Sequence, residues 1–439
     1  MTNIADENQS WREALRPYLQ REPIGALLLG LSSGFPIAMI AATLSTRLAE
    51  TGMARPSVTA FGVFILVYNF KFLWAPIIDR VTLPVLGRLL GQRRAWLFLV
   101  AACVVCSVIW LGSVDPAGEA SLLVAAVFTV AFFGATFDIV IDAFRVDSLS
   151  PRQLEAGSGM SQYGWRLGNA GAAALALVVA GRAGWAEAYA AATIFAVPAI
   201  LAGLIVGEPP RRTAALTKAG WSRAGLVETF SAPLADFLTR PNAWLVLCFL
   251  LVHKIGDTLA NLTLRLLFND IGFSKDEIAA YDVVAGLLAF FLGIFVGGII
   301  YRRFGMMQAV LISLFLMAVT NLGFAVLAMV GHNNIVMALA VGFENFASGV
   351  GGLAIVAYLS WLCDLRFTAT QFALLSSLAS IVGRGLSAIG AGWLIDLLGY
   401  PLFYLLTTLL AVPGMLLFWI LMRRDPPAPE SASPHPPGK

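Results

Sequence analysis

Charged side chains are scarce in this chain. Only 13% of its 439 residues are Asp, Glu, Lys or Arg, whereas 59% are hydrophobic, and the mean hydropathy is +0.80. Soluble domains carry about 25% charged residues. The net charge is only +3, and no stripe of basic residues is present of the kind that binds nucleic acid. These deficits indicate an integral membrane protein and exclude nucleic acid as its partner.

Residues that perform covalent or metal chemistry are also few. The chain has three histidines and four cysteines, and the cysteines lie in apolar stretches, so we expect neither disulfides nor a metal site. The phosphate-binding pattern GxxxxGK followed by Ser or Thr does not occur, and no nucleophilic motif of Ser, His and Asp is recognisable. We therefore expect no enzyme, no catalytic residue and no cofactor. If the protein uses energy, an ion or proton gradient is therefore the expected source.

Apolar stretches recur along the whole chain, each with the roughly 18–25 residues that span a bilayer as a helix. The alternation typical of membrane β-strands is lacking. The pattern therefore predicts an all-α integral membrane protein with twelve transmembrane helices, over residues 24–46, 59–79, 95–113, 121–145, 157–180, 186–206, 243–267, 277–300, 305–330, 335–363, 370–393 and 401–422.

Polar stretches divide the chain into five predicted parts. Near the N-terminus, Trp11, Leu15 and Tyr18 recur at helical spacing among arginines, as in a helix that lies on a membrane surface, and we expect no cleavable signal peptide. Lys and Arg gather in the loops after the second and eighth helices and in the tail, which predicts that both termini are cytoplasmic. The parts are a cytoplasmic amphipathic segment (1–23), a six-helix bundle (24–207), a cytoplasmic linker (208–240), a second six-helix bundle (241–422) and a disordered Pro-rich tail (423–439).

The two halves of the chain repeat one another. The stretch TLSTRLAETGMARPSVTAF (43–61) aligns with NLTLRLLFNDIGFSKDEIAAY (261–281), so that Arg47 falls on Arg265. Further matches keep an offset between 217 and 222, which chance similarity of apolar helices would not maintain. Six helices repeated in the same orientation form a parallel repeat. This is the plan of the major facilitator superfamily (MFS), in which the substrate site lies between the halves.

Ionisable residues inside the predicted helices are informative, because a charge at the bilayer centre costs at least about 2.5–3.5 kcal/mol. The third, sixth, ninth and twelfth helices contain none in their interiors, so we expect those four to face lipid and the others to surround a polar cavity. In the fourth helix, Asp138, Asp142 and Arg145 lie within about 60° of one another at 100° per residue. Lys71 of the second helix should lie at the depth of Asp138 and could pair with it.

Charged residues without a counterpart in the other half of the chain are assigned to transport, since a substrate site need not be symmetric. Their alternative role is a buried ion pair that fixes helix contacts. We predict that Asp138 and Asp142 carry the coupling proton. The predicted substrate-binding residues are Tyr68, Asn69, Lys71, Gln162, Tyr163, Lys254, Asp257, Asn261, Glu344 and Asn345. A second set lies near helix ends or recurs in both halves, which suits a gate or a structural ion pair: Asp79, Arg80, Arg145, Asp147, Arg166, Arg302, Asp364 and Arg384.

Six stretches of the sequence resemble the AmpG family of muropeptide permeases within the MFS. They are SSGFPIAM (32–39), FKFLWAPIIDR (70–80), FDIVIDAFRVDSL (137–149), GWRLG (164–168), GFENFASGVG (342–351) and FTATQFALLSSLASIVGR (367–384). The resemblance implies proton-driven import of N-acetylglucosaminyl-1,6-anhydromuramyl peptides from periplasm to cytoplasm. It thereby implies a role in cell-wall recycling and, in some bacteria, in β-lactamase induction. It also implies that FDIVIDAFRVD, FKFLW and GFENF line or gate the route.

We therefore expect a monomeric, multi-pass importer in the bacterial inner membrane, whose partners are the anhydromuropeptide, protons and the lipid bilayer. The first alternative is another solute on the same fold, such as a different peptide, a siderophore or an acyl-coenzyme A. The second is a non-transporting MFS-fold assembly factor or sensor. The interior of such a protein need not keep ionisable residues on several helices, as this sequence does.

Overall fold

The structure is a computed structural model that describes residues 16–53, 57, 60–118, 120–210 and 223–424. These residues form helices and no strand. Parts of the predicted N-terminal segment, linker and tail, including Trp11 and Leu15, lie outside the described residues. The chain divides into two compact units. One comprises Met1–Ala219 with Asp364–Thr370, and the other comprises Gly220–Cys363 with Gln371–Lys439.

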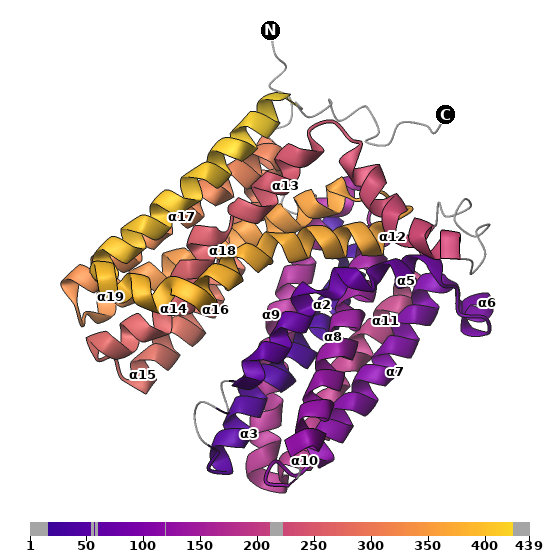
Figure 1. The fold of residues 1–439 in the computed structure, drawn as a ribbon, viewed down its shortest axis with the longest axis horizontal. Helices are drawn as coiled ribbons and strands as arrows, with labels where there is room; N and C mark the ends of the chain where they lie inside the picture. The colour runs from indigo at the N-terminus through magenta and orange to yellow at the C-terminus, as the bar shows by residue number, and fades with distance from the viewer. Residues whose placement is uncertain (1–15, 54–56, 58–59, 119, 211–222, 425–439) are drawn as a thin grey trace. The chain divides into compact units, whose positions relative to one another are not determined.

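The first unit is a bundle built around α2, α8 and α9. In Figure 1 these helices run side by side with α7, and α2 packs along most of α9. Short 3₁₀ and π-helical turns, labelled η, interrupt the bundle. Its elements are η1 (Arg16–Leu19), α2 (Arg21–Ala38), η2 (Met39–Thr43), α3 (Leu44–Glu50), η3 (Phe61–Asn69), η4 (Lys71–Leu73), α5 (Ala75–Arg80), α6 (Leu86–Leu90), α7 (Gln92–Ser113), α8 (Ala120–Ser148), η5 (Pro151–Gln153), α9 (Leu154–Ala183), α10 (Trp185–Ala192), η6 (Thr193–Ala196) and α11 (Val197–Val206).

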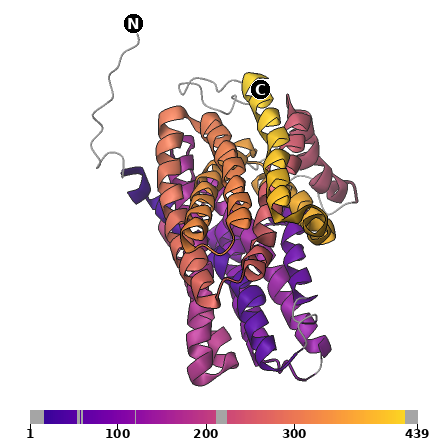
Figure 2. The ribbon, with the colours of Figure 1, turned by 90° about the vertical axis from the view of Figure 1, so that its left-hand side faces the viewer.

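The second unit is a bundle in which α18 packs against both α16 and α17. Figure 2 shows it from the side, with α19 as the last helix. α19 bends at Gly399, whose φ of 72° leaves helical geometry, so its two arms correspond to the last two predicted helices. The elements are α12 (Arg223–Leu238), α13 (Ala243–Val252), α14 (Ile255–Ile271), α15 (Lys275–Ile278), η8 (Ala279–Ala285), α16 (Gly286–Phe304), α17 (Met306–Val330), α18 (Asn334–Leu362) and α19 (Thr368–Arg424).

Nine helical stretches of the described chain are long and apolar enough to cross a membrane. Exposed apolar side chains follow their outer faces at helical spacing, as a lipid-facing surface requires. On α17 they are Phe315, Val319, Leu322, Val326 and Met329, and on α16 they are Leu288, Leu292, Phe295 and Ile299. The eighth predicted helix, which contains Asp282, thus also presents an exposed apolar face.

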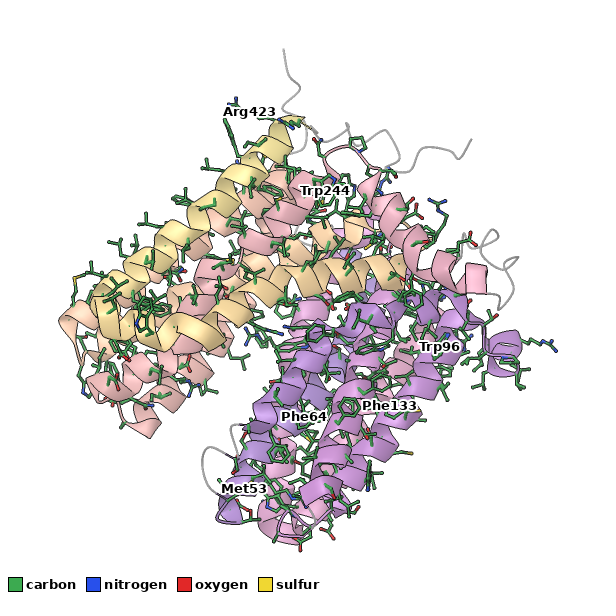
Figure 3. The ribbon with its side chains drawn as sticks, viewed as in Figure 1. Met53, Phe64, Trp96, Phe133, Trp244 and Arg423 are labelled. Carbon is green, nitrogen blue, oxygen red and sulfur yellow. The ribbon has the colours of Figure 1, made fainter. Side chains whose placement is uncertain are left out.

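Aromatic and basic side chains lie at several helix ends. The guanidinium of Arg423 lies 3.8 Å from the centre of the Trp419 ring near the end of α19, and Trp244 is exposed near the start of α13 (Figure 3). Trp and Arg at helix ends are typical of membrane–water interfaces, where an amphipathic ring meets the headgroups. Both positions therefore suit the end of a membrane span.

Glycines allow the main chains of α2 and α9 to touch. A Cβ on Gly34 would lie 2.3 Å from the carbonyl oxygen of Trp165, and a Cβ on Gly168 would lie 2.0 Å from that of Leu31. Such contacts leave no room for any side chain. Small residues spaced four apart are the usual means of close helix packing in membranes. The same device recurs where Gly293 of α16 meets α18.

The second predicted helix, 59–79, is not one α-helix. It consists of the 3₁₀ segments η3 and η4 followed by α5. Its sequence FGVFILVYNFKFLW is rich in aromatic and β-branched residues, which favour α-helix less than straight-chain residues do. At the offset of the internal repeat, the second half has the π-helical turn η8, so both halves leave α-helical geometry at the corresponding place. Irregular turns of this kind often mark functional positions.

Candidate functional site

Four charged residues form a connected cluster in the first unit, which we call the α8 cluster: Lys71, Asp138, Asp142 and Arg145. Lys71 Nζ lies 2.5 Å from Asp138 Oδ2 and 3.5 Å from Asp142 Oδ2. The other oxygen of Asp142 lies 3.3 Å from Nη2 of Arg145. Ser33 of α2 donates its hydroxyl to Asp138 Oδ1 at 2.6 Å. The structure thus joins the lysine and the aspartate that the sequence placed at one depth.

Local geometry explains how the cluster forms. Residues 138, 142 and 145 follow helical spacing on one face of α8, and Lys71 begins η4 directly beside that face. Gly134 on the same face leaves room for the Tyr68 side chain, because a Cβ there would lie 2.3 Å from the Tyr68 hydroxyl. Tyr68 and Asn69 are buried just before Lys71. Both predicted substrate residues therefore lie in the packed wall beside the cluster.

An aromatic row joins α8 to η3 and to Trp74. The Trp74 ring lies 5.1 Å from that of Phe132, Phe132 lies 6.3 Å from Phe128, and Phe128 lies 6.4 Å from Phe64 of η3. Figure 3 labels Phe64 in this region. Trp74 also donates its indole N–H to the Thr136 hydroxyl at 3.0 Å. The row gives the first unit a band of aromatic rings along α8.

A second polar group lies in the other unit, where α13 ends and α14 begins. The side chain of Asp257 is buried and accepts a hydrogen bond from Asn261 Nδ2 at 3.2 Å, while Lys254 in the break between the helices is exposed. His253 beside it is buried, with Nδ1 3.0 Å from the Leu250 carbonyl oxygen and its ring 4.8 Å from Phe249. Sequence analysis did not single out His253, because one histidine in an apolar stretch carries no spacing signal.

The other predicted substrate residues are distributed over α9 and α18. Glu344 is buried and accepts the Ser348 hydroxyl at 2.8 Å, and Asn345 donates to the Val341 carbonyl at 3.1 Å. Gln162 and Tyr163 are partly exposed on α9. Two residues of the predicted gating and structural set lie nearby in the sequence or on the last helix. Arg166 is on α9, 5.8 Å from the centre of the Trp165 ring, and Arg384 is on α19. Their roles stay predictions.

Two members of the predicted gating and structural set, Asp79 and Asp147, join a buried network centred on Arg93. The sequence places Arg93 only among the basic residues of the loop after the second predicted helix. The Arg93 side chain is 0% exposed, and it donates from Nε to Asp147 at 2.7 Å and from Nη2 to Asp79 at 2.9 Å. Thr368 donates its hydroxyl to Asp147 at 2.6 Å, and Thr370 donates its backbone N–H to Asp79 at 2.8 Å. Residues 368–370 belong to the first unit, and Asp79 caps the helical turn that they begin, where the helix dipole favours an anion.

The aspartate that corresponds to Asp147 in the second half is Asp364. Asp364 pairs with Arg366, 2.9 Å away, and both side chains are partly exposed. The repeated arginines differ as well: Arg47 donates to the Val114 carbonyl at 2.6 Å, whereas Arg265 lies 2.5 Å from Asp282. Arg80 ends α5, and Arg302 is exposed near the end of α16. The repeated arginines Arg47 and Arg265 thus make different contacts.

Comparison with known proteins agrees with these features. The family model "Major Facilitator Superfamily" matches residues 24–383. The chain is 35% identical over 408 residues to the "Anhydromuropeptide permease" of Escherichia coli (strain K12), covering 92% of this chain and 81% of that protein. It is 29% identical to the "Putative transporter AmpG 4" of Rickettsia conorii, covering 90% of this chain and 95% of the relative.

Solved structures share the fold at lower identity. The proton:xylose symporter XylE bound to 6-bromo-6-deoxy-D-glucose matches with a TM-score of 0.69 at 14% identity, over 91% of this chain and 95% of XylE. A bacterial homologue of the iron transporter ferroportin matches with a TM-score of 0.64 at 16% identity, over 92% and 100%. The predicted MFS fold is confirmed. The chain belongs to the major facilitator superfamily and, within it, to the AmpG family of permeases.

Proposed function

We propose that this protein is a proton-coupled importer of N-acetylglucosaminyl-1,6-anhydromuramyl peptides, which it carries from periplasm to cytoplasm by alternating access for peptidoglycan recycling. The observation that supports this choice of substrate is the 35% identity, over 92% of the chain, to the anhydromuropeptide permease of Escherichia coli. We further propose that it is a monomer in the bacterial inner membrane with both termini cytoplasmic.

The α8 cluster supports proton coupling. Asp138 and Asp142 are partly accessible, yet they lie in a helix long and apolar enough to span the membrane. Carboxylates retained at such a position are costly and are typical of proton and ion pathways. Asp138 is the first candidate for the proton carrier, because it is the carboxylate nearer to Lys71. Lys71 Nζ lies 2.5 Å from Asp138 and 3.5 Å from Asp142.

The substrate contacts are proposed from both units. A disaccharide with a peptide offers sugar faces that stack on aromatic rings, and amides and carboxylates that need polar partners. In the first unit, the aromatic row and Lys71 supply such groups. In the second unit, Lys254, Asp257 and Asn261 lie along α14 and the break before it.

Uptake of labelled anhydromuropeptide into membrane vesicles tests the substrate. Accumulation should require an imposed proton gradient and should be blocked by excess unlabelled anhydromuropeptide, but not by an unrelated peptide, a siderophore or an acyl-coenzyme A. Accumulation without a gradient would remove the coupling, and equal competition by another solute would remove the substrate. Empty vesicles treated identically are the control.

Asp138→Asn is expected to abolish gradient-driven accumulation and to keep exchange of solute down its own gradient. Without the titrating carboxyl, solute and proton no longer bind as a linked pair, so the inside-to-outside ratio should fall to about one. Accumulation and counterflow in vesicles measure the two activities separately. Asp115→Asn, which changes an exposed carboxylate in the loop after α7, should accumulate solute as the wild type does. Full accumulation by the Asp138 variant would assign the proton to another group.

A further inference from the structure

The charges of the α8 cluster are arranged in two layers. The side chains of Asp138 and Asp142 are 21% and 19% exposed, whereas those of Lys71 and Arg145 are 6% and 0% exposed. An anion that approaches the cluster therefore meets two carboxylates before it meets a cation. The two positive and two negative charges sum to zero, so the cluster in this form offers an approaching anion no net attraction.

Asp138 is the carboxylate that forms the closest ion pair with Lys71. Asp142 lies farther from Nζ, at 3.5 Å against 2.5 Å, and it has a second cation in Arg145 at 3.3 Å. Asp138 has a second partner of a different kind, the Ser33 hydroxyl at 2.6 Å. A hydroxyl both donates and accepts, so a protonated Asp138 retains a hydrogen bond at Ser33 without Lys71. The surroundings of Asp138 therefore accommodate both its charged and its neutral form.

We propose that Lys71 is a binding site for a carboxylate of the transported solute, open only while Asp138 is protonated. When Asp138 takes a proton from solution, Lys71 loses its nearest counter-ion and the cluster gains a net positive charge. A solute carboxylate at Lys71 then restores neutrality, and loss of the proton from Asp138 expels it. This inference rests on the proposed function and specifies how its coupling operates: one lysine serves two carboxylates in turn.

The titratable and charged groups around Asp138 determine which other residues could produce the same pH dependence of solute binding. They are Tyr68 of η3, Lys71 of η4, and Asp142 and Arg145 of α8 itself. Elements packed against α8 also carry Asp79 on α5 and Arg93 on α7, but Arg93 forms ion pairs with both Asp79 and Asp147. Within the part of the chain that the structure describes, Asp142 is therefore the competing carboxylate for which the test must control.

Binding of two matched probes to the purified protein tests the inference. The probes are an N-acetylglucosaminyl-1,6-anhydromuramyl peptide with free carboxylates and the same peptide with those groups amidated. Affinities are measured from about pH 5.5 to about pH 8, where the free carboxylates of the probe stay ionised. Where Asp138 is ionised in the free protein, affinity for the acidic peptide should rise about tenfold for each unit that the pH falls. Affinity for the amidated peptide should stay constant.

Three variants identify the residues. Asp138→Asn should bind the acidic peptide with the same affinity at every pH, at least as tightly as the wild type at its most acidic point. Asp142→Asn should keep the pH dependence. The double variant Lys71→Gln/Asp138→Asn leaves Asp142 and Arg145 as a neutral pair, and it should bind the acidic and amidated peptides equally. Because this double variant strands no charge, a folding defect is not expected to obscure the result.

The outcomes separate this inference from the proposed function. If the acidic peptide binds and accumulates with the gradient, but its affinity is independent of pH, the inference is overturned and the function stands. The inference is likewise overturned if Asp138→Asn keeps the slope or if the amidated peptide shows it too. If neither peptide binds the wild type at any pH, the proposed substrate is wrong and the inference falls with it.

Discussion

Arg93→Met should destabilise the protein by about 3–5 kcal/mol, because it leaves two buried carboxylates without their cation. The Arg93 side chain is 0% exposed and bonds to Asp147 and Asp79 at 2.7 and 2.9 Å. Methionine also has a long side chain but brings no charge, so the loss comes mainly from the stranded anions. Thermal unfolding of the purified protein in detergent, with the yield of inserted protein, measures the effect.

A matched control and a rescue sharpen the interpretation. Arg88 is exposed on α6, and Arg88→Met should unfold like the wild type. Adding Asp79→Asn and Asp147→Asn to Arg93→Met should recover most of the stability, since asparagine keeps an acceptor for Thr370 and Thr368 without the charge. If the triple variant is as unstable as the single one, the cost is lost packing and the electrostatic account is wrong.

The α8 cluster shows what the sequence can predict about this site. Helical spacing maps directly onto a face, so 138, 142 and 145 were placed together without a structure. Counting residues from the helix ends set the depth of Lys71, and the structure joins Lys71 to Asp138. This reasoning needs only the rise per residue of a helix, which gives the depth of each residue in the bilayer. The roles of these residues stay predictions.

Arg93 shows where such reasoning stops. Hydropathy started the third helix at residue 95, and the arginines before it matched the basic loops that set orientation. In the structure, α7 begins at Gln92, so Arg93 lies in its first turn and points into the bundle. Helix ends are the least certain part of a sequence-based assignment. A shift of three residues here separates an exposed loop charge from the centre of a buried network.

The prediction of one α-helix over residues 59–79 differs from the structure for another reason. The hydropathy of this stretch predicts a span over residues 59–79, but hydropathy does not distinguish 3₁₀, α and π turns. The backbone from Phe61 to Leu73 is mostly 3₁₀. This tighter helix turns after three residues, so faces assigned at 100° per residue do not hold along it. Depth was therefore predictable for Lys71, whereas burial of Tyr68 and Asn69 was not.

Gly168→Ala should separate α2 from α9 and destabilise the protein by at least about 2 kcal/mol, because the new Cβ would lie 2.0 Å from the Leu31 carbonyl oxygen. A backbone atom cannot swing aside as a side chain can. Thermal unfolding in detergent measures the loss. Gly181 lies on the same helix with nothing within 4 Å of its added Cβ, so Gly181→Ala should match or slightly exceed wild-type stability.

Pairs of substitutions test whether helix separation is the cause. Gly34 meets α9 at the same interface, where its Cβ would lie 2.3 Å from the Trp165 carbonyl oxygen. Once one substitution has moved the helices apart, the second costs little, so Gly34→Ala/Gly168→Ala should destabilise less than the sum of the two. Gly293 lies on α16 in the other unit, so its effect should add to that of Gly168. Full additivity of the Gly34 and Gly168 effects would mean that each clash is relieved locally, with α2 and α9 still in contact.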